Sequence, residues 1–178
     1  MHRIISLLAL VLLFTGMAMA QDQNTPRVEI FGGYSHLVAD VNGSSFNLNG
    51  AHVSATESLN SWFGGVLDFS AHYGTLGGLN VNTESIMYGA LVAYRKSRAI
   101  TPFAHASFGA TRGSAGYLGI SKSDTHLGMA FGGGVDVKLT ERVSFRVIQA
   151  DYLQTNFLNL KQYNIRASSG LVFRLGRR

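Results

Sequence analysis

An alternation between two kinds of residue constrains the fold of this sequence more than any other feature. It is clearest near the C-terminus, where Ile165, Leu171 and Phe173 share one parity, and asparagine, arginine, serine and glycine lie between the mostly apolar positions. Successive side chains of a β-strand point to opposite faces, so a period of two residues is typical of a strand with two different faces. The segment 163–175 is therefore predicted to form one long strand.

The same period recurs along the chain and predicts eight strands. In the segment 125–138, for example, Leu127, Met129 and Phe131 alternate with histidine, glycine and alanine. The predicted strands cover residues 28–38, 49–56, 62–73, 85–94, 102–112, 125–138, 143–154 and 163–175.

One predicted strand, 143–154, breaks the alternation. Val147 shares its parity with Gln149 and Asp151, whereas Arg146 shares its parity with Ile148. A regular strand would therefore place a charged or polar side chain on the apolar face. A β-bulge between Val147 and Gln149 avoids this cost, because one extra residue restores each side chain to its own face.

The connections between the predicted strands alternate in length. The short ones are 57–60, 95–99 and 139–142, and the longer ones are 39–48, 74–83, 113–124 and 155–162. An antiparallel up-and-down meander that crosses an outer membrane has short periplasmic turns and longer external loops. The order of lengths predicts such a meander, with both termini on the periplasmic side.

The first twenty residues have the layout of a secretory signal peptide. Arg3 precedes the apolar stretch 4–14, and the small residues Ala18 and Ala20 stand just before the polar Gln21. This order is typical of a peptide that is cleaved after Ala20. We therefore predict a signal peptide at 1–20 and a single exported domain at 21–178.

Composition indicates what surrounds the exported domain. Charged residues make up 14% of the chain, whereas about 25% is usual for a soluble domain. The chain has no cysteine, which excludes disulfides and thiolate metal sites. The formal net charge is +5, and nothing in the sequence points to a nucleic-acid partner, a metal or a cofactor.

These observations predict an all-β, eight-stranded, antiparallel up-and-down transmembrane barrel. A sheet in lipid must close on itself so that every backbone group is bonded. The apolar face then contacts lipid, and the small and polar face fills an interior about wide enough for side chains, without an open pore. Aromatic residues near strand ends are expected to lie at the two membrane interfaces, namely Trp62, Phe63, Tyr73, Tyr94, Tyr163 and Phe173.

The last strand carries a local motif. Ser168, Gly170, Phe173 and Leu175 form the pattern polar, any, glycine, any, any, aromatic, any, hydrophobic. This pattern resembles the C-terminal assembly signal of the OmpA/OmpX-type family of eight-stranded outer-membrane β-barrels, also described as small porin-like barrel domains. The segment 28–175 resembles this family along its length, and Arg146 with the Asp151-Tyr152 pair resembles a recurrent pattern of its penultimate strand.

The resemblance implies a location and partners. It implies the outer membrane of a Gram-negative-type bacterium, contact with membrane lipid and lipopolysaccharide, insertion by the outer-membrane assembly machinery, and a monomer. The role it implies is structural, in envelope integrity or in surface interactions, and it implies no enzymatic activity.

Two alternative functions stay open on the sequence alone. Some barrels of this size modify lipid A with histidine and serine. Here His105 and Ser107 share one face of a strand, and they are expected to line the lumen together with His52, His72, His126 and Asp68. The predicted parity turns His105 and Ser107 inward, away from lipid, so we assign no catalytic residue. The second alternative is a soluble, exported, lipocalin-like barrel that binds an apolar ligand.

Overall fold

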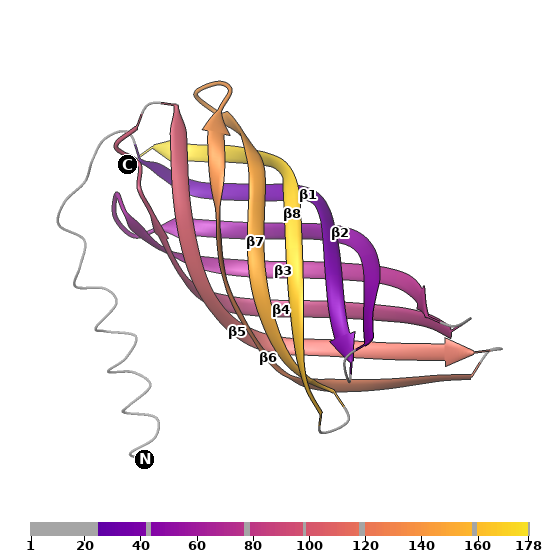
Figure 1. Cartoon of the computed structure of the whole chain (residues 1–178). Coiled ribbons are helices and arrows are strands. Elements are labelled where there is room, and N and C mark those ends of the chain that lie inside the picture. Colours follow the sequence, from indigo (N-terminus) through magenta and orange to yellow (C-terminus); the bar gives the residue numbers. More distant parts are fainter. Residues whose placement is uncertain are drawn as a thin grey trace, which may run out of the picture.

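The computed structural model is a closed barrel of eight antiparallel strands (Figure 1). It describes residues 25–177, except 42–43, 77–78, 98, 118–119 and 158–159. The strands are β1 (Pro26–Val41), β2 (Ser44–Ser58), β3 (Phe63–Leu76), β4 (Leu79–Ala93), β5 (Ile100–Tyr117), β6 (Ile120–Lys138), β7 (Val143–Phe157) and β8 (Leu160–Arg177). The described residues contain no helix long and apolar enough to cross a membrane.

Each strand pairs with its neighbours in sequence, and β1 pairs with β8 to close the sheet. Because the strand number is even, β1 begins and β8 ends at the same end of the barrel. We call this the turn end, since it also holds the connections 59–62, 94–99 and 139–142. The opposite end, where β1 meets β2 and β5 meets β6, is called the loop end.

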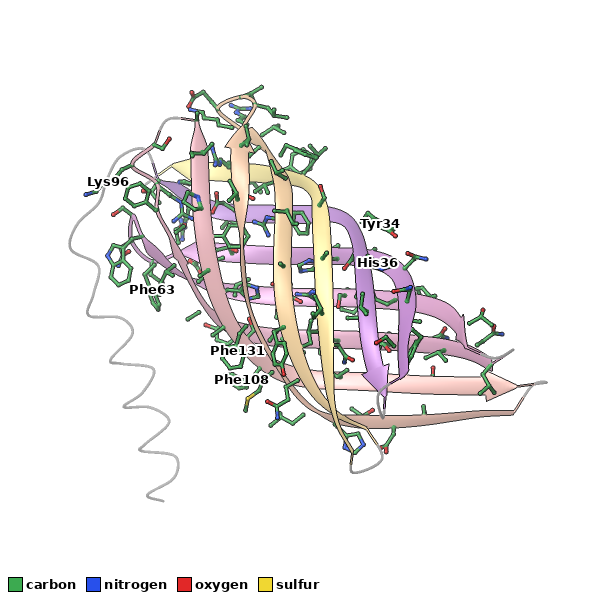
Figure 2. All side chains as sticks on the ribbon, in the orientation of Figure 1. Tyr34, His36, Phe63, Lys96, Phe108 and Phe131 are labelled. Carbon is green, nitrogen blue, oxygen red and sulfur yellow. The ribbon has the colours of Figure 1, made fainter. Side chains whose placement is uncertain are left out.

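The prediction of a small and polar inner face and an apolar outer face is confirmed. Small and polar side chains such as Asp68 (1% exposed) and Arg166 (fully buried) point into the lumen. Apolar side chains such as Leu127 (63% exposed) point outward. Phe108 on β5 and Phe131 on β6 lie on this outer face of neighbouring strands (Figure 2). The outside of the barrel is therefore an apolar surface.

The predicted bulge in β7 is also confirmed. The pairing of β7 with β8 shifts between Arg146 and Gln149, and β6 shows the matching shift between Val135 and Asp136. Arg146 and Gln149 are both buried in the lumen, whereas Val147 between them is 49% exposed. The extra residue thus keeps both polar side chains away from the outer face.

The loop end differs from the expectation of long loops. The segments expected as loops are mostly strand, and β5 and β6 remain paired up to Tyr117 and Ile120. Strand pairing satisfies the backbone of these polar segments. Their side chains, however, do not alternate between apolar and polar, so the period that reveals the other strands is missing. The residues of the expected signal peptide, Ala18, Ala20 and Gln21, lie outside the described residues.

Candidate functional site

The lumen contains a network of hydrogen bonds and ion pairs between buried side chains, and Arg166 of β8 connects the parts of this network. Its guanidinium donates to both carboxylate oxygens of Asp68 on β3, at 2.9 and 3.0 Å. It also donates from Nε to Asp151 Oδ2 on β7, at 2.8 Å. One buried cation therefore joins the carboxylate of Asp151, its pairing partner on the neighbouring strand, to the carboxylate of Asp68 on a strand across the lumen.

Each of these carboxylates also binds a histidine that contacts a serine. Asp151 Oδ1 lies 2.8 Å from His105 Nε2, and His105 Nδ1 lies 3.2 Å from Ser107 Oγ. On the other side, Asp68 Oδ2 lies 2.5 Å from His52 Nε2, while His52 Nδ1 lies 3.2 Å from the hydroxyl oxygen of Ser168. The lumen thus contains two serine–histidine–aspartate arrangements connected through one arginine.

The arrangement has the order of groups found in a catalytic triad but not the access that such a triad needs. A nucleophilic serine must reach the substrate and lie beside donors that stabilise the developing oxyanion. Here Ser107 is 4% exposed and His105 is 7% exposed, and both point into a filled interior. Lipid acyl chains would contact the opposite face of the sheet.

Of the two other histidines predicted to line the lumen, His72 extends this network and His126 lies apart from it. His72 Nε2 lies 2.8 Å from the hydroxyl oxygen of Ser35, which itself lies 2.9 Å from that of Ser168. His126 is near the loop end, where its Nε2 lies 2.8 Å from Asp124 Oδ2. Among the described residues, no group of three or more histidine, cysteine, aspartate or glutamate side chains is arranged to hold a metal ion.

A second charged layer lies nearer the turn end. Arg146 donates to Asp136, with its Nε 2.8 Å from Oδ1, and to Gln149 Oε1 at 2.6 Å. Its guanidinium carbon also lies 4.4 and 4.2 Å from the ring centres of Phe31 and Phe103. Such stacking is favourable when a cation has been removed from water. The two rings and the guanidinium fill the cross-section here.

Two further layers of side chains fill the lumen, one at the turn end and one toward the loop end. At the turn end, Glu29 accepts from Arg95 Nη2 at 2.5 Å and from Arg174 Nε at 3.3 Å. Toward the loop end, five buried apolar residues form a cluster that we call the apolar plug: Leu37, Leu48, Met87, Ala130 and Leu153. The lumen is therefore occupied along its length by ion pairs, hydrogen bonds and packed side chains.

The four residues of the expected assembly signal occupy two faces of β8. Ser168 is buried in the lumen, whereas Phe173 is 47% exposed and Leu175 is 50% exposed on the outer face. Gly170 lies opposite Gly33 of β1. A Cβ atom at Gly170 would meet the backbone of β1, so the space it leaves is at the strand seam instead of in the open lumen.

Sequence reasoning placed Arg166 and Asp68 on polar faces but did not connect them. These residues come from strands that are not neighbours, and a period along one strand carries no information about contacts across the lumen. The inward rings of Phe31 and Phe103 were also missed, because they break the rule of a polar inner face. One signal of this network was available in the sequence, namely the presence of both arginine and aspartate at positions predicted to face the lumen.

Comparison with known proteins gives a consistent result. The profile of the family described as outer membrane protein beta-barrel domain matches residues 6–173 of this chain. The fold is similar to that of Neisserial surface protein A, with a TM-score of 0.74 and 16% identity over 83% of this chain and 97% of that chain. A comparison with curated protein sequences found no match.

Two further solved structures are similar in fold. Ail, the attachment invasion locus protein of Yersinia pestis, has a TM-score of 0.58 and 16% identity over 84% of this chain and 99% of that chain. The outer membrane protein OprG from Pseudomonas aeruginosa has a TM-score of 0.58 and 12% identity over 86% of this chain and 99% of that chain.

Proposed function

Because the chain belongs to the outer membrane protein beta-barrel domain family, we propose that it is a closed barrel without an open large pore, with a structural, envelope-integrity or surface-interaction role in the outer membrane. The observation that carries this proposal is the occupied lumen. Arg166 binds Asp151 on the neighbouring strand and Asp68 across the interior, and the apolar plug lies toward the loop end. A solute would have to break buried ion pairs and displace packed side chains to pass.

The exposed outer face supports placement in lipid. Large apolar side chains that are about half exposed, such as Leu127, Phe131 and Ile165, would be costly in water over so wide a surface. A lipocalin-like barrel requires the reverse distribution, with an apolar cavity inside and polar residues outside. This distribution therefore favours the membrane barrel over a soluble ligand carrier.

The histidine and serine side chains of the lumen support a structural role over lipid A modification. Asp151, which could orient His105 as a base, is also bound by Arg166 and Gln149. In this setting the hydrogen bonds satisfy buried polar groups that would otherwise destabilise the interior. We propose that no reaction is catalysed there.

The orientation in the membrane belongs to the same proposal, with the turn end in the periplasm and the loop end outside. At the loop end β5 and β6 continue together beyond Gly128, where the pairing of β6 with β7 begins. This extended hairpin and the neighbouring strand ends would be presented to the surroundings of the cell. They are the surface that we propose for interactions outside the membrane.

Three measurements test the proposal. Cell fractionation should recover the protein with the outer membrane, and the unboiled protein should migrate differently from the boiled protein on a denaturing gel. In planar bilayers, the purified barrel should show no large, stable conductance. Recovery from the soluble periplasm with equal mobility in both samples would contradict the membrane location, and a porin-like conductance would contradict the closed lumen.

The orientation can be tested separately because the chain has no cysteine. A membrane-impermeant maleimide should label Ser114→Cys, near the loop end, on intact cells. It should label Ser97→Cys, in the turn between β4 and β5, only after the outer membrane is permeabilised. The opposite result would reverse the orientation and leave the barrel itself unaffected.

A further inference from the structure

The charge of this barrel is unevenly distributed between its two ends. The turn end carries six basic side chains that the structure describes, which are Arg27, Arg95, Lys96, Lys138, Arg142 and Arg174. The acidic residues at that end are Glu29, Glu57 and Glu141. At the loop end, by contrast, the charged side chains that the structure describes are Arg112, Glu84 and Asp124. The turn end therefore holds the excess of positive charge.

Half of the basic side chains at the turn end are used in ion pairs. Arg95 and Arg174 contact the buried Glu29, and Lys138 lies 2.6 Å from Glu141. These pairs stabilise the end of the barrel and leave little positive charge to offer to a partner. The other basic side chains are Arg27, Lys96 and Arg142, all of which are exposed. We call these three residues the basic rim.

The basic rim is distributed around the barrel. Arg27 is at the start of β1, Lys96 is in the turn between β4 and β5, and Arg142 is in the turn between β6 and β7. A compact protein partner would contact one side of the barrel end. Charges spread around the perimeter fit a surface that surrounds the barrel on all sides, which is the headgroup layer of a membrane leaflet.

Aromatic side chains place the basic rim at headgroup depth. Trp62 is 58% exposed and Tyr94 is 57% exposed, and such rings prefer the membrane–water interface. The backbone amide of Ala93 donates to Trp62 O at 2.8 Å, so these two connections lie together. Phe63 and Lys96 lie at the same end of the barrel (Figure 2). Lys96 follows Tyr94 by two residues in the connection between β4 and β5.

We propose that the basic rim binds the phosphate groups of anionic phospholipids in the leaflet around the turn end, and so enriches these lipids next to the barrel. The proposal rests on the membrane location proposed above. Juxtamembrane basic residues are attracted to anionic headgroups, an effect worth about a fivefold preference for each residue near the surface. The attraction is electrostatic, so it must weaken as salt shortens the Debye length to about 3 Å at 1 M.

Trp62 makes the test direct, because it is the one tryptophan of the sequence. The purified full-length barrel is reconstituted in vesicles of phosphatidylcholine with a minor fraction of phosphatidylglycerol. Either the phosphatidylglycerol or an equal amount of the phosphatidylcholine carries brominated acyl chains, which quench tryptophan at short range. At low salt, brominated phosphatidylglycerol should quench Trp62 about twofold more per mole than brominated phosphatidylcholine.

Two variants identify the source of the preference. The triple variant Arg27→Gln, Lys96→Gln and Arg142→Gln should quench equally with both lipids, as should the wild type in 1 M salt. Arg112→Gln removes an exposed cation at the loop end and should keep the full preference. The difference in gel mobility between boiled and unboiled samples confirms that each variant is folded.

The proposal is overturned by equal quenching from the two lipids in the wild type at low salt, or by a preference that persists in the triple variant. These outcomes differ from a failure of the proposed function. A barrel that reconstitutes, resists detergent until heated and shows no lipid preference would still be a closed membrane barrel.

Discussion

Gly33 of β1 and Gly170 of β8 lie directly opposite each other at the seam that closes the barrel. A Cβ atom on Gly33 would meet the backbone oxygen of Ser169, and one on Gly170 would meet the backbone of Gly32 and Gly33. The two strands therefore approach more closely than a pair of larger residues would allow. Gly32, the next residue along β1, has nothing within 4 Å of its own Cβ position.

We expect Gly33→Ala and Gly170→Ala to destabilise the closed barrel by about 1–3 kcal/mol, the usual cost of overpacking. Gly32→Ala is the matched control and should leave stability unchanged. The measurement is the fraction of heat-modifiable protein during urea unfolding in lipid vesicles. Equal stability of the three variants would show that the seam tolerates a methyl group at these positions.

Removing the guanidinium of Arg166 from the lumen should destabilise the barrel more than adding a methyl group at the seam. We expect Arg166→Met to lower the free energy of unfolding by about 3–5 kcal/mol, because Asp68 and Asp151 would remain as buried carboxylates without their cation. Lys138→Met removes a partly exposed ion pair with Glu141 and should change stability by about 0–1 kcal/mol. The same urea titration compares them, and similar effects from both would contradict the central role of Arg166.

The bulge in β7 predicts opposite outcomes for two deletions. Deleting Val147 leaves Arg146 facing inward, Ile148 outward and Gln149 inward, so the strand becomes regular and the barrel should still fold. Deleting Ala150 forces Gln149 or Asp151 onto the lipid face, and the yield of heat-modifiable protein should fall sharply. Equal yields from the two deletions would show that the bulge does not set the faces of this strand.

Phe173 provides the test of the expected assembly signal. We expect Phe173→Asp to be exported yet to accumulate outside the outer membrane, because it places a carboxylate on the lipid face and removes the aromatic residue of the motif. Ser114→Asp, near the loop end, should give normal yield. Mass spectrometry of the mature N-terminus at Gln21 controls for export. A normal outer-membrane yield of Phe173→Asp would make the resemblance of the motif accidental.

Lipid A should be unaffected by the serine and histidine of the lumen. His105 and Ser107 are buried behind the sheet from any acyl chain, so His105→Ala and Ser107→Ala should leave the lipid A mass spectrum of expressing cells the same as that of the wild type. Loss of an acyl chain from lipid A that depends on either residue would replace the structural role with a catalytic one.

The strands and their faces were predictable because lipid and lumen impose opposite demands on alternate residues. The bulge was predictable for the same reason, since Arg146 and Gln149 cannot share a regular strand without one of them facing outward. Near the loop end the two faces no longer differ in polarity, and segments such as 113–117 of β5 give no periodic signal although they are strand.

Contacts across the lumen were not predictable from the period. The pairing of Arg166 with Asp68 depends on the tilt and stagger of the closed sheet, which bring β8 and β3 to the same depth. The stacking of Phe31 and Phe103 on Arg146 depends on the same geometry. The sequence of one strand identifies neither the contacting residue on another strand nor the depth in the lumen at which that residue lies.

The position of Arg166 on the last strand also has a consequence for biogenesis. Until β8 arrives, Asp68 and Asp151 face a half-built interior without the guanidinium that later binds both of them. A chain that stops short of β8 keeps this unbalanced negative charge and cannot form the stable interior. The interior would thus become stable only in a chain that contains all eight strands, because the arginine that neutralises the aspartates of β3 and β7 lies on β8.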